Sequence, residues 1–369
     1  MKKALFHSNP QNEIYPFGDI NNKFKKVLFS LKISNVQFYI RFIAITVYFL
    51  FSSGILFAEK IPAEPGYIIA HTISIPGIRY GNTGPMGEFD SVIIPLKRVG
   101  RLFLIEAKID NLVGNFLFDT GAAQLVLNST YFRKYMTISE AEGGGITGST
   151  GLIQRTRIEK LDVAGLLYRD LTADVADLGH IENRRGVKIL GLFGVCMLKG
   201  LEVVININHN ELRLYRLDKT GNRTSVQKTE FRADLTEKIV VFHNILFIKA
   251  RIGGKTLDFC LDTGAESNVL NCYASKKVLS TVTILRRSDL MGVGSGEAEV
   301  LLGKLNDFVL GEHPILNMQV IIVSLGALSA SYGYPIDGML GFDFFEKGEV
   351  CINLVKNELK VSFTKTGKS

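Results

Sequence analysis

LFLIEAKIDNLVGNFLFDTGAAQLVLN, at residues 102–128, aligns with ILFIKARIGGKTLDFCLDTGAESNVLN, at residues 245–271. At an offset of 143 residues, 11 of the 27 aligned positions are identical. The identical positions include the tetrapeptide Asp-Thr-Gly-Ala, which stands at 119–122 and again at 262–265. A match of this length within one chain indicates an internal duplication.

The ends of the two units match as well. GLFGVCMLKGLEVVININHNELRLYR, at residues 191–216, aligns with GMLGFDFFEKGEVCINLVKNELKVSF, at residues 338–363, at an offset of 147 residues. We therefore predict two homologous lobes, at 90–216 and 239–369, joined by the charged linker 217–238.

Both units have the sequence pattern of short β-strands. Runs rich in Val, Ile, Leu and Phe, such as residues 102–109 and 203–207, are separated by Gly, Asn or Asp turns. We find no helical pattern of three turns or more in the two lobes. These features predict an all-β fold with two barrel-like or sandwich-like lobes. The hydrophobic fraction of 46% and the absence of a three-residue glycine period exclude a disordered or collagen-like chain.

The formal net charge of +7 is concentrated near the N-terminus. Residues 1–41 contain seven Lys/Arg and two Asp/Glu, whereas residues 59–369 contain 36 Lys/Arg and 34 Asp/Glu, a charge of +2. Because this main part is nearly neutral, we predict no nucleic-acid partner. Residues 42–58 carry no charge, and a basic flank before an apolar run is typical of a secretory signal or a signal anchor.

We therefore predict an exported protein, which is periplasmic, extracellular or anchored in the cytoplasmic membrane through residues 42–58 with its main part outside. Residues 1–58 would form the basic leader with a signal peptide or a membrane anchor. The polar Ser52-Ser53-Gly54 break favours cleavage near Ala58, whereas the long leader favours an anchor. Residues 59–89 form an N-terminal extension that could be a propeptide, a tether or an extra strand.

The other residue types that often mark enzymes show no pattern here. The six histidines are scattered, no serine lies in a G-x-S-x-G motif, and the four cysteines have no metal-binding spacing. The sequence therefore predicts neither a metal site nor a cofactor. Cys260 and Cys272 could pair, or all four cysteines could be buried thiols.

Each unit places an aspartate directly after a hydrophobic run and before a Thr-Gly turn. Asp119 follows Phe-Leu-Phe and Asp262 follows Phe-Cys-Leu, and about 70–80 residues later each unit has two apolar residues and a glycine, Gly194 or Gly341. An isolated Asp-Thr-Gly is commonly only a turn. Its recurrence at equivalent points of both units indicates a functional site instead.

This arrangement resembles the aspartic peptidases of the retropepsin/pepsin superfamily and, more narrowly, bacterial two-lobed aspartyl proteases with retropepsin-like lobes. The resemblance covers residues 90–369 and implies two retropepsin-like (acid protease) β-barrel lobes. It implies that Asp119 and Asp262 meet as a catalytic dyad around one water and hydrolyse peptide bonds in a peptide or protein substrate. Two adjacent carboxylates cannot both ionise easily, so they would share a proton.

The resemblance also implies roles for the residues that support the dyad. Thr120 and Thr263 would lock the two turns together through hydrogen bonds to the backbone. Gly121 and Gly264 would let backbone amides approach the carboxylates. Because one chain supplies both halves of the site, we expect a monomer with pseudo-twofold lobes.

The family closes a β-hairpin flap over its substrate, and two glycine-rich stretches, 141–154 and 291–300, are the candidates. The flap glycines would be Gly143, Gly144, Gly145, Gly148, Gly292, Gly294 and Gly296. Neither stretch has the tyrosine of pepsin's flap, which favours the retropepsin side. Glu266, close to the dyad in sequence, could shape substrate preference, but a solvated turn residue is the simpler interpretation.

Two other classes of function remain open. A catalytically idle duplicated β-barrel could bind peptides or envelope partners, although retention of both aspartates argues against it. An actin-like sugar kinase or ATPase also has Asp-x-Gly phosphate loops, but that fold needs long helices, which the sequence lacks.

Overall fold

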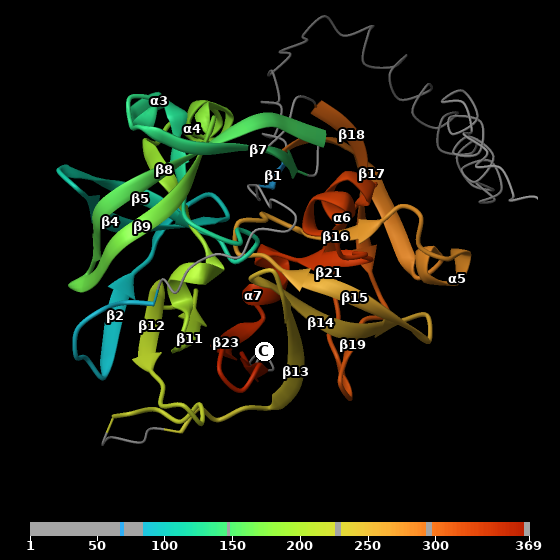
Figure 1. The fold of residues 1–369 in the computed structure, drawn as a ribbon. Helices are drawn as coiled ribbons and strands as arrows, with labels where there is room; N and C mark the ends of the chain where they lie inside the picture. Colours follow the sequence, from blue (N-terminus) through green and yellow to red (C-terminus); the bar gives the residue numbers. More distant parts are fainter. Residues whose placement is uncertain (1–66, 70–83, 146–147, 226–229, 293–296, 365–369) are drawn as a thin grey trace, which may run out of the picture. The chain divides into compact units, whose positions relative to one another are not determined.

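The computed structural model describes residues 67–69, 84–145, 148–225, 230–292 and 297–364, which all lie in one compact unit, Glu64–Ser369. This unit consists mainly of β-strands with short helices (Figure 1). The apolar segment 42–58 and most of the extension 59–89 lie outside the described residues. No helix within the described ranges combines the length and the apolar character that a membrane span requires.

Lobe 1 extends from the first strand after the extension to residue 216. Its elements are β2 (Ser91–Pro95), β3 (Lys97–Val99), β4 (Leu102–Ile109), β5 (Leu112–Phe118), β6 (Val126–Asn128), α3 (Ser129–Phe132), β7 (Thr137–Gly145), β8 (Gly148–Val163), β9 (Leu166–Ala176), α4 (Gly179–Arg185), β10 (Ile189–Phe193), the 3-10 helix η1 (Val195–Leu198), β11 (Leu201–Asn206) and β12 (Glu211–Arg216). The sheet order is β3-β4-β5-β10-β6-β9-β8-β7, and a pairing of β4 with β8 closes a barrel.

Lobe 2 repeats this order of elements. Its elements are β13 (Leu235–Phe242), β14 (Ile245–Ile252), β15 (Lys255–Leu261), β16 (Asn268–Asn271), α5 (Lys276–Leu279), β17 (Val282–Gly292), β18 (Glu297–Leu305), β19 (Val309–Leu310), β20 (His313–Pro314), β21 (Met318–Val323), α6 (Gly326–Tyr332), β22 (Gly338–Leu340), α7 (Phe342–Phe345), β23 (Gly348–Asn353) and β24 (Glu358–Phe363). The strand order β17-β18-β21-β16-β22-β15-β14 matches β7-β8-β9-β6-β10-β5-β4 of lobe 1. The predicted fold, two homologous all-β lobes, is therefore confirmed.

Two segments outside the predicted lobes also form strands. Within the extension 59–89, β1 (Tyr67–Ile69) runs parallel to β17, with Ile69 opposite Gly292. Residues 67–69 of the extension thus form an extra strand at the edge of lobe 2, whereas Met86 makes an isolated bridge to Leu167 of lobe 1. The first strand of lobe 2 begins at Leu235, inside the stretch predicted as the linker.

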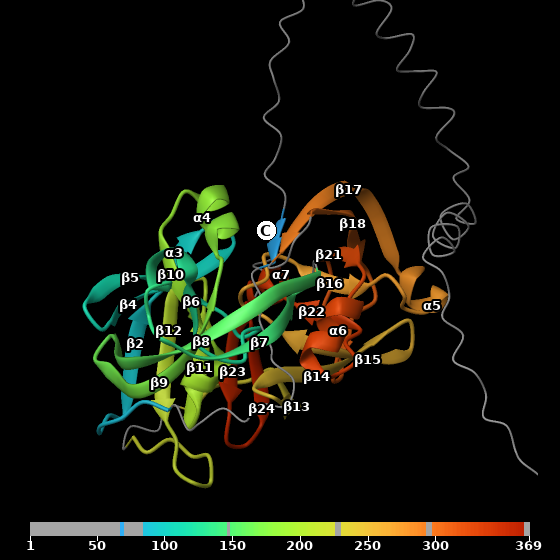
Figure 2. The same ribbon diagram turned by 45° about the horizontal axis from the view of Figure 1, so that its top comes forward.

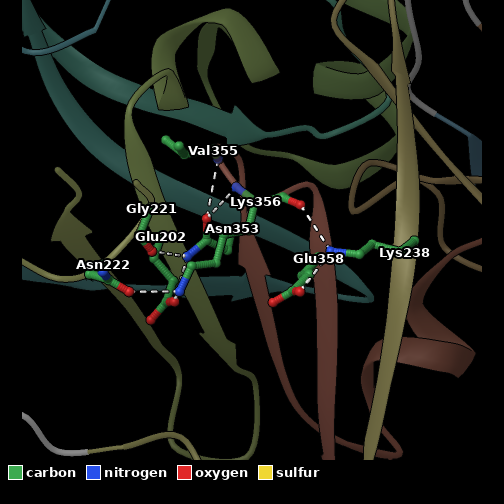
Figure 3. Close-up of polar contacts among 8 residues, drawn as sticks. All are labelled: Glu202, Gly221, Asn222, Lys238, Asn353, Val355, Lys356 and Glu358. Atoms are coloured by element: carbon green, nitrogen blue, oxygen red, sulfur yellow. Dashed lines mark hydrogen bonds and ion pairs between the residues drawn. The ribbon is translucent and has the colours of Figure 1, made fainter. Parts of the chain in front are cut away.

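A sheet shared by both lobes joins them through β11 and β23, in the order β13-β24-β23-β11-β12-β2. Asn353 Nδ2 donates a hydrogen bond to Glu202 (3.1 Å) and another to the Gly221 carbonyl (2.9 Å; Figure 3). Asn206 Nδ2 donates to Glu349 (3.0 Å) in the same way. Glu349 lies 147 residues after Glu202, and Asn353 lies 147 residues after Asn206. The two Asn–Glu hydrogen bonds between the lobes are therefore equivalent.

One buried cross-strand pair differs in kind between the lobes. In lobe 1, Arg155 on β8 faces Asp174 on β9, with 2.9 Å between Arg155 Nε and Asp174 Oδ1, and both residues are buried. Burial raises the pKa of Asp174 to about 6, although the Arg155 charge opposes the rise. The strand register places Leu302 and Ile321 at the equivalent positions of lobe 2, also buried.

We expect Arg155→Leu to lower the free energy of unfolding by about 3–5 kcal/mol, because the Asp174 carboxyl would stay buried without the cation that faces it. The double change Arg155→Leu/Asp174→Ile copies lobe 2 and should be neutral or stabilising by about 1–4 kcal/mol. Chemical denaturation of the two variants measures both values. Equal destabilisation by the single and the double change would contradict this account.

Candidate active site

Both predicted aspartates lie at the end of a buried strand, Asp119 after β5 and Asp262 after β15. The neighbouring strands β10 and β22 run parallel to these strands. The Asp119 N–H donates to the Phe193 carbonyl (3.1 Å), and the Asp262 N–H donates to the Leu340 carbonyl (2.9 Å). Both aspartates are fully buried. The two apolar-apolar-Gly elements therefore fix the strand ends that carry the aspartates.

Gly194 and Gly341 lie against the turns that follow the aspartates. A Cβ on Gly194 would be 2.2 Å from the Gln124 carbonyl oxygen, and a Cβ on Gly341 would be 2.5 Å from that of Ser267. Both are backbone atoms, which cannot easily move aside. The structure therefore requires glycine at both positions, and the spacing seen in the sequence has a packing reason.

Thr120 and Thr263 connect the two turns by reciprocal hydrogen bonds. The Thr120 N–H donates to Thr263 Oγ1, and the Thr263 N–H donates to Thr120 Oγ1, both at 3.0 Å. The Thr120 hydroxyl donates to the Leu261 carbonyl (2.9 Å). The Thr263 hydroxyl donates to the Phe118 carbonyl (2.7 Å). These buried bonds are the contacts that the resemblance implies for the two threonines, and they bring the two aspartates together.

Gly121 and Gly264 present backbone donors to the carboxyl groups. The Gly121 N–H donates to Asp119 Oδ1 (2.9 Å), and the Gly264 N–H donates to Asp262 Oδ1 (2.8 Å). A Cβ on Gly121 would lie only 2.5 Å from the carboxyl carbon of Asp262. The backbone of the first turn therefore lies against the carboxyl group of the second.

The electrostatics of the pair favour a retained proton. Burial raises the pKa of Asp119 well above its ordinary value, and the charge of Asp262 and a hydrogen bond between the two carboxyl groups raise it further. Hydrogen bonds from the N–H groups of Gly121 and Ala122 oppose the rise. On balance, these effects favour the protonated form of Asp119.

The predicted flaps form two β-hairpins. Gly145 pairs with Gly148 at the end of the β7–β8 hairpin, which also contains Gly143 and Gly144. This hairpin of lobe 1 contacts α6 of lobe 2, as Figures 1 and 2 show. In the β17–β18 hairpin Gly292 ends β17, whereas residues 293–296, with Gly294 and Gly296, lie outside the described residues.

The interpretation of Glu266 as a solvated turn residue is wrong. Glu266 is 1% exposed, and its carboxylate forms an ion pair with Arg185 at the end of α4. Arg101 of lobe 1 donates to the Glu266 carbonyl (3.1 Å) and to Asp343 Oδ1 (2.9 Å). The Ser267 hydroxyl donates to the other oxygen of Asp343 (2.7 Å). Two arginines of lobe 1 thus hold the segment that follows the second aspartate.

Tyr332, the last residue of α6, contacts the site although no motif in the sequence marks it. Its hydroxyl donates to the Gly121 carbonyl at 2.8 Å and is buried. Helices α4 and α6 are equivalent: Arg185 and Tyr332 are 147 residues apart, and each precedes a left-handed glycine, Gly186 or Gly333. The 147-residue offset aligns these two helix ends, but the residues at the aligned positions differ and nothing in the sequence marks either as a contact to the site.

The cysteines of the described residues are free thiols, so the alternative of a Cys260–Cys272 disulfide is wrong. Cys196, Cys260 and Cys351 are buried, and Cys272 is partly buried. In the part of the chain that the structure describes, no group of three or more His, Cys, Asp or Glu side chains could hold a metal ion.

Comparison with known proteins bears on the same region. A sequence model of the aspartyl protease family matches residues 248–344, roughly a quarter of the chain, which include Asp262 and Gly341. No curated protein matches the chain. Among solved structures, an aspartic proteinase from Irpex lacteus matches with a TM-score of 0.45 and 13% sequence identity, over 76% of this chain and 100% of that one. The family match confirms, for lobe 2, the resemblance to aspartyl proteases.

Proposed function

We propose that the chain is an aspartic endopeptidase that hydrolyses peptide bonds with a water activated between Asp119 and Asp262. One observation carries the proposal: two buried carboxyl groups stand on equivalent turns that reciprocal threonine bonds hold together. The match of residues 248–344 to the aspartyl protease family supports it.

In the proposed mechanism the two carboxyl groups divide the acid and base roles. The ionised group takes a proton from water as the water oxygen attacks the peptide carbonyl carbon. The protonated group donates its hydrogen to the carbonyl oxygen as negative charge develops there. A proton then passes to the leaving amine when the C–N bond breaks. The enzyme forms no covalent bond to its substrate.

A digestion experiment tests the proposal. The purified chain should cleave a denatured protein into peptides that mass spectrometry can identify, and Asp119→Asn should not. Asp258→Asn is the matched control, since Asp258 lies on β15, the strand directly before Asp262, but its carboxylate pairs with Lys249 (2.9 Å). Binding of the denatured protein without any cleavage would favour the idle peptide-binding barrel instead.

We expect a bell-shaped dependence of kcat/KM on pH, with an optimum between mildly acidic and neutral. Burial and the neighbouring Asp262 raise the pKa of Asp119, so the singly ionised pair forms at a higher pH than an ordinary aspartate would. Neither Ala122 nor Ala265 has a hydroxyl that could hydrogen-bond a carboxylate, so no such bond lowers the pKa of Asp119. A pH profile of peptide cleavage measures the optimum, and a peak at strongly acidic pH would contradict this reasoning.

We also propose that the enzyme is exported and acts as a monomer. The basic residues 1–41 followed by the uncharged residues 42–58 support export. An alkaline phosphatase fused after residue 60 should be active, and a cytoplasm-dependent reporter at the same position should be silent; the reverse result would overturn export. Both aspartates come from one chain, so specific activity should not fall on dilution.

A further inference from the structure

One hydrogen bond between the lobes joins Tyr332 to the turn that follows Asp119. Tyr332 of lobe 2 is fully buried, and its hydroxyl donates to the Gly121 carbonyl of lobe 1 at 2.8 Å. Its ring packs in a buried apolar cluster and meets Phe247 edge-on, with 6.4 Å between the ring centroids. A phenol locked by packing on a rigid helix end is suited to hold its acceptor in place.

The acceptor is part of the machinery around Asp119. The Gly121 N–H donates to Asp119 Oδ1 at 2.9 Å, and the next N–H, that of Ala122, donates to the Asp119 backbone carbonyl at 3.2 Å. A contact that restrains Gly121 therefore also restrains the N–H that stabilises the Asp119 carboxylate. The Tyr332 hydroxyl and the Asp119 carboxyl group are therefore both hydrogen-bonded to Gly121, one through its carbonyl and the other through its N–H.

The other half of the site lacks this arrangement. Arg185, the counterpart of Tyr332 at the end of α4, forms its ion pair with the side chain of Glu266. Glu266 lies four residues after Asp262. The contact of Arg185 is therefore made to a side chain and not to a backbone carbonyl of the turn. Within the described ranges, the two equivalent helix ends therefore contact the site differently, Tyr332 through a backbone carbonyl and Arg185 through a side chain.

We propose that Tyr332 is a positioning residue that holds Gly121, the backbone donor to Asp119 Oδ1, in place and thereby favours the ionised form of this aspartate. The proposal rests on the proposed function for its kinetic consequences, but its effect on Asp119 is independent of any activity. Loss of the hydroxyl weakens stabilisation of the carboxylate, so the ionisation of the pair moves to higher pH.

Tyr332→Phe, which removes one oxygen atom, should therefore shift the acid limb of the pH profile upward by about 0.5–1 unit. It should lower kcat several-fold below that limb and leave KM nearly unchanged. Tyr334→Phe is the matched control. Tyr334 also packs on Phe247, with 4.2 Å between ring centroids, but its hydroxyl lies 3.5 Å from Asp258. The control should leave the acid limb in place.

A second variant tests the same idea in the opposite direction. Fluorotyrosine at position 332 keeps the hydroxyl and makes it a stronger donor, so the acid limb should move down. Titration of the Asp119 carboxyl carbon by NMR should show the same two shifts, whether or not the protein cleaves peptides. Lower activity without any shift, or equal shifts in the Tyr332 and Tyr334 variants, would overturn the proposal. Shifts in the NMR titration of a protein that cleaves nothing would support it while refuting the proposed function.

Discussion

Asparagine in place of either Asp119 or Asp262 is expected to lower kcat by about 10³-fold or more, because each carboxyl group needs its partner to divide the acid and base roles. The double variant should be hardly less active than either single one, since residues that act as one unit show strongly non-additive losses. Single-turnover cleavage of a fluorogenic peptide can measure losses of this size.

The controls separate this effect from damage to the fold. Asn is nearly the same size as Asp, and thermal unfolding should show that all three variants remain folded. The charge-neutralising control Asp258→Asn should keep most of the activity. If the losses of the two single variants multiplied in the double variant, the aspartates would serve separate sites and the dyad would be refuted.

Gly121→Ala is expected to have the second-largest effect, about a 10²-fold loss of activity, because a methyl group would have to displace the opposite carboxyl group. Its Cβ would stand 2.5 Å from the carboxyl carbon of Asp262. The Asp262 carboxyl group is held by the strand end and by the turn that the two threonines link. It could not move aside without changing its geometry toward Asp119.

Gly326→Ala is the matched control for this change. Gly326 begins α6, and a Cβ there would meet only the Ser324 hydroxyl, at an ordinary 3.5 Å. Kinetics and the free energy of unfolding should both be close to those of the unchanged protein. Full activity in Gly121→Ala would show that the backbone of this turn does not approach the second carboxyl group as closely as the structure has it.

The sequence predicted the parts of the molecule that repeat. Asp-Thr-Gly-Ala recurs at an offset of 143 residues and the downstream glycine at 147. The structure gives the glycine a physical reason, since a Cβ on Gly194 would lie 2.2 Å from the Gln124 carbonyl oxygen. The repeat also predicted the two-lobed fold, because each copy carries the same order of strands and turns.

Contacts between the lobes that differ between the two halves of the site could not be predicted in this way. Glu266 looks like a turn residue, and its partner Arg185 lies 81 positions away in the other lobe. Tyr332 ends a helix of seven residues, which is too short to show a helical period in the sequence. Such residues acquire their roles only from the way the lobes pack, which no local pattern records.

The reciprocal bonds between β11 and β23, from Asn353 to Glu202 and from Asn206 to Glu349, have the symmetry of an isologous dimer interface. In a dimer of identical halves, every substitution appears twice and both sides of the site must remain alike. Within one continuous chain, each half can change alone, as Tyr332 and Arg185 have done. A peptide has a direction, from its amino end to its carboxyl end, and a site with two different sides can distinguish one direction from the other.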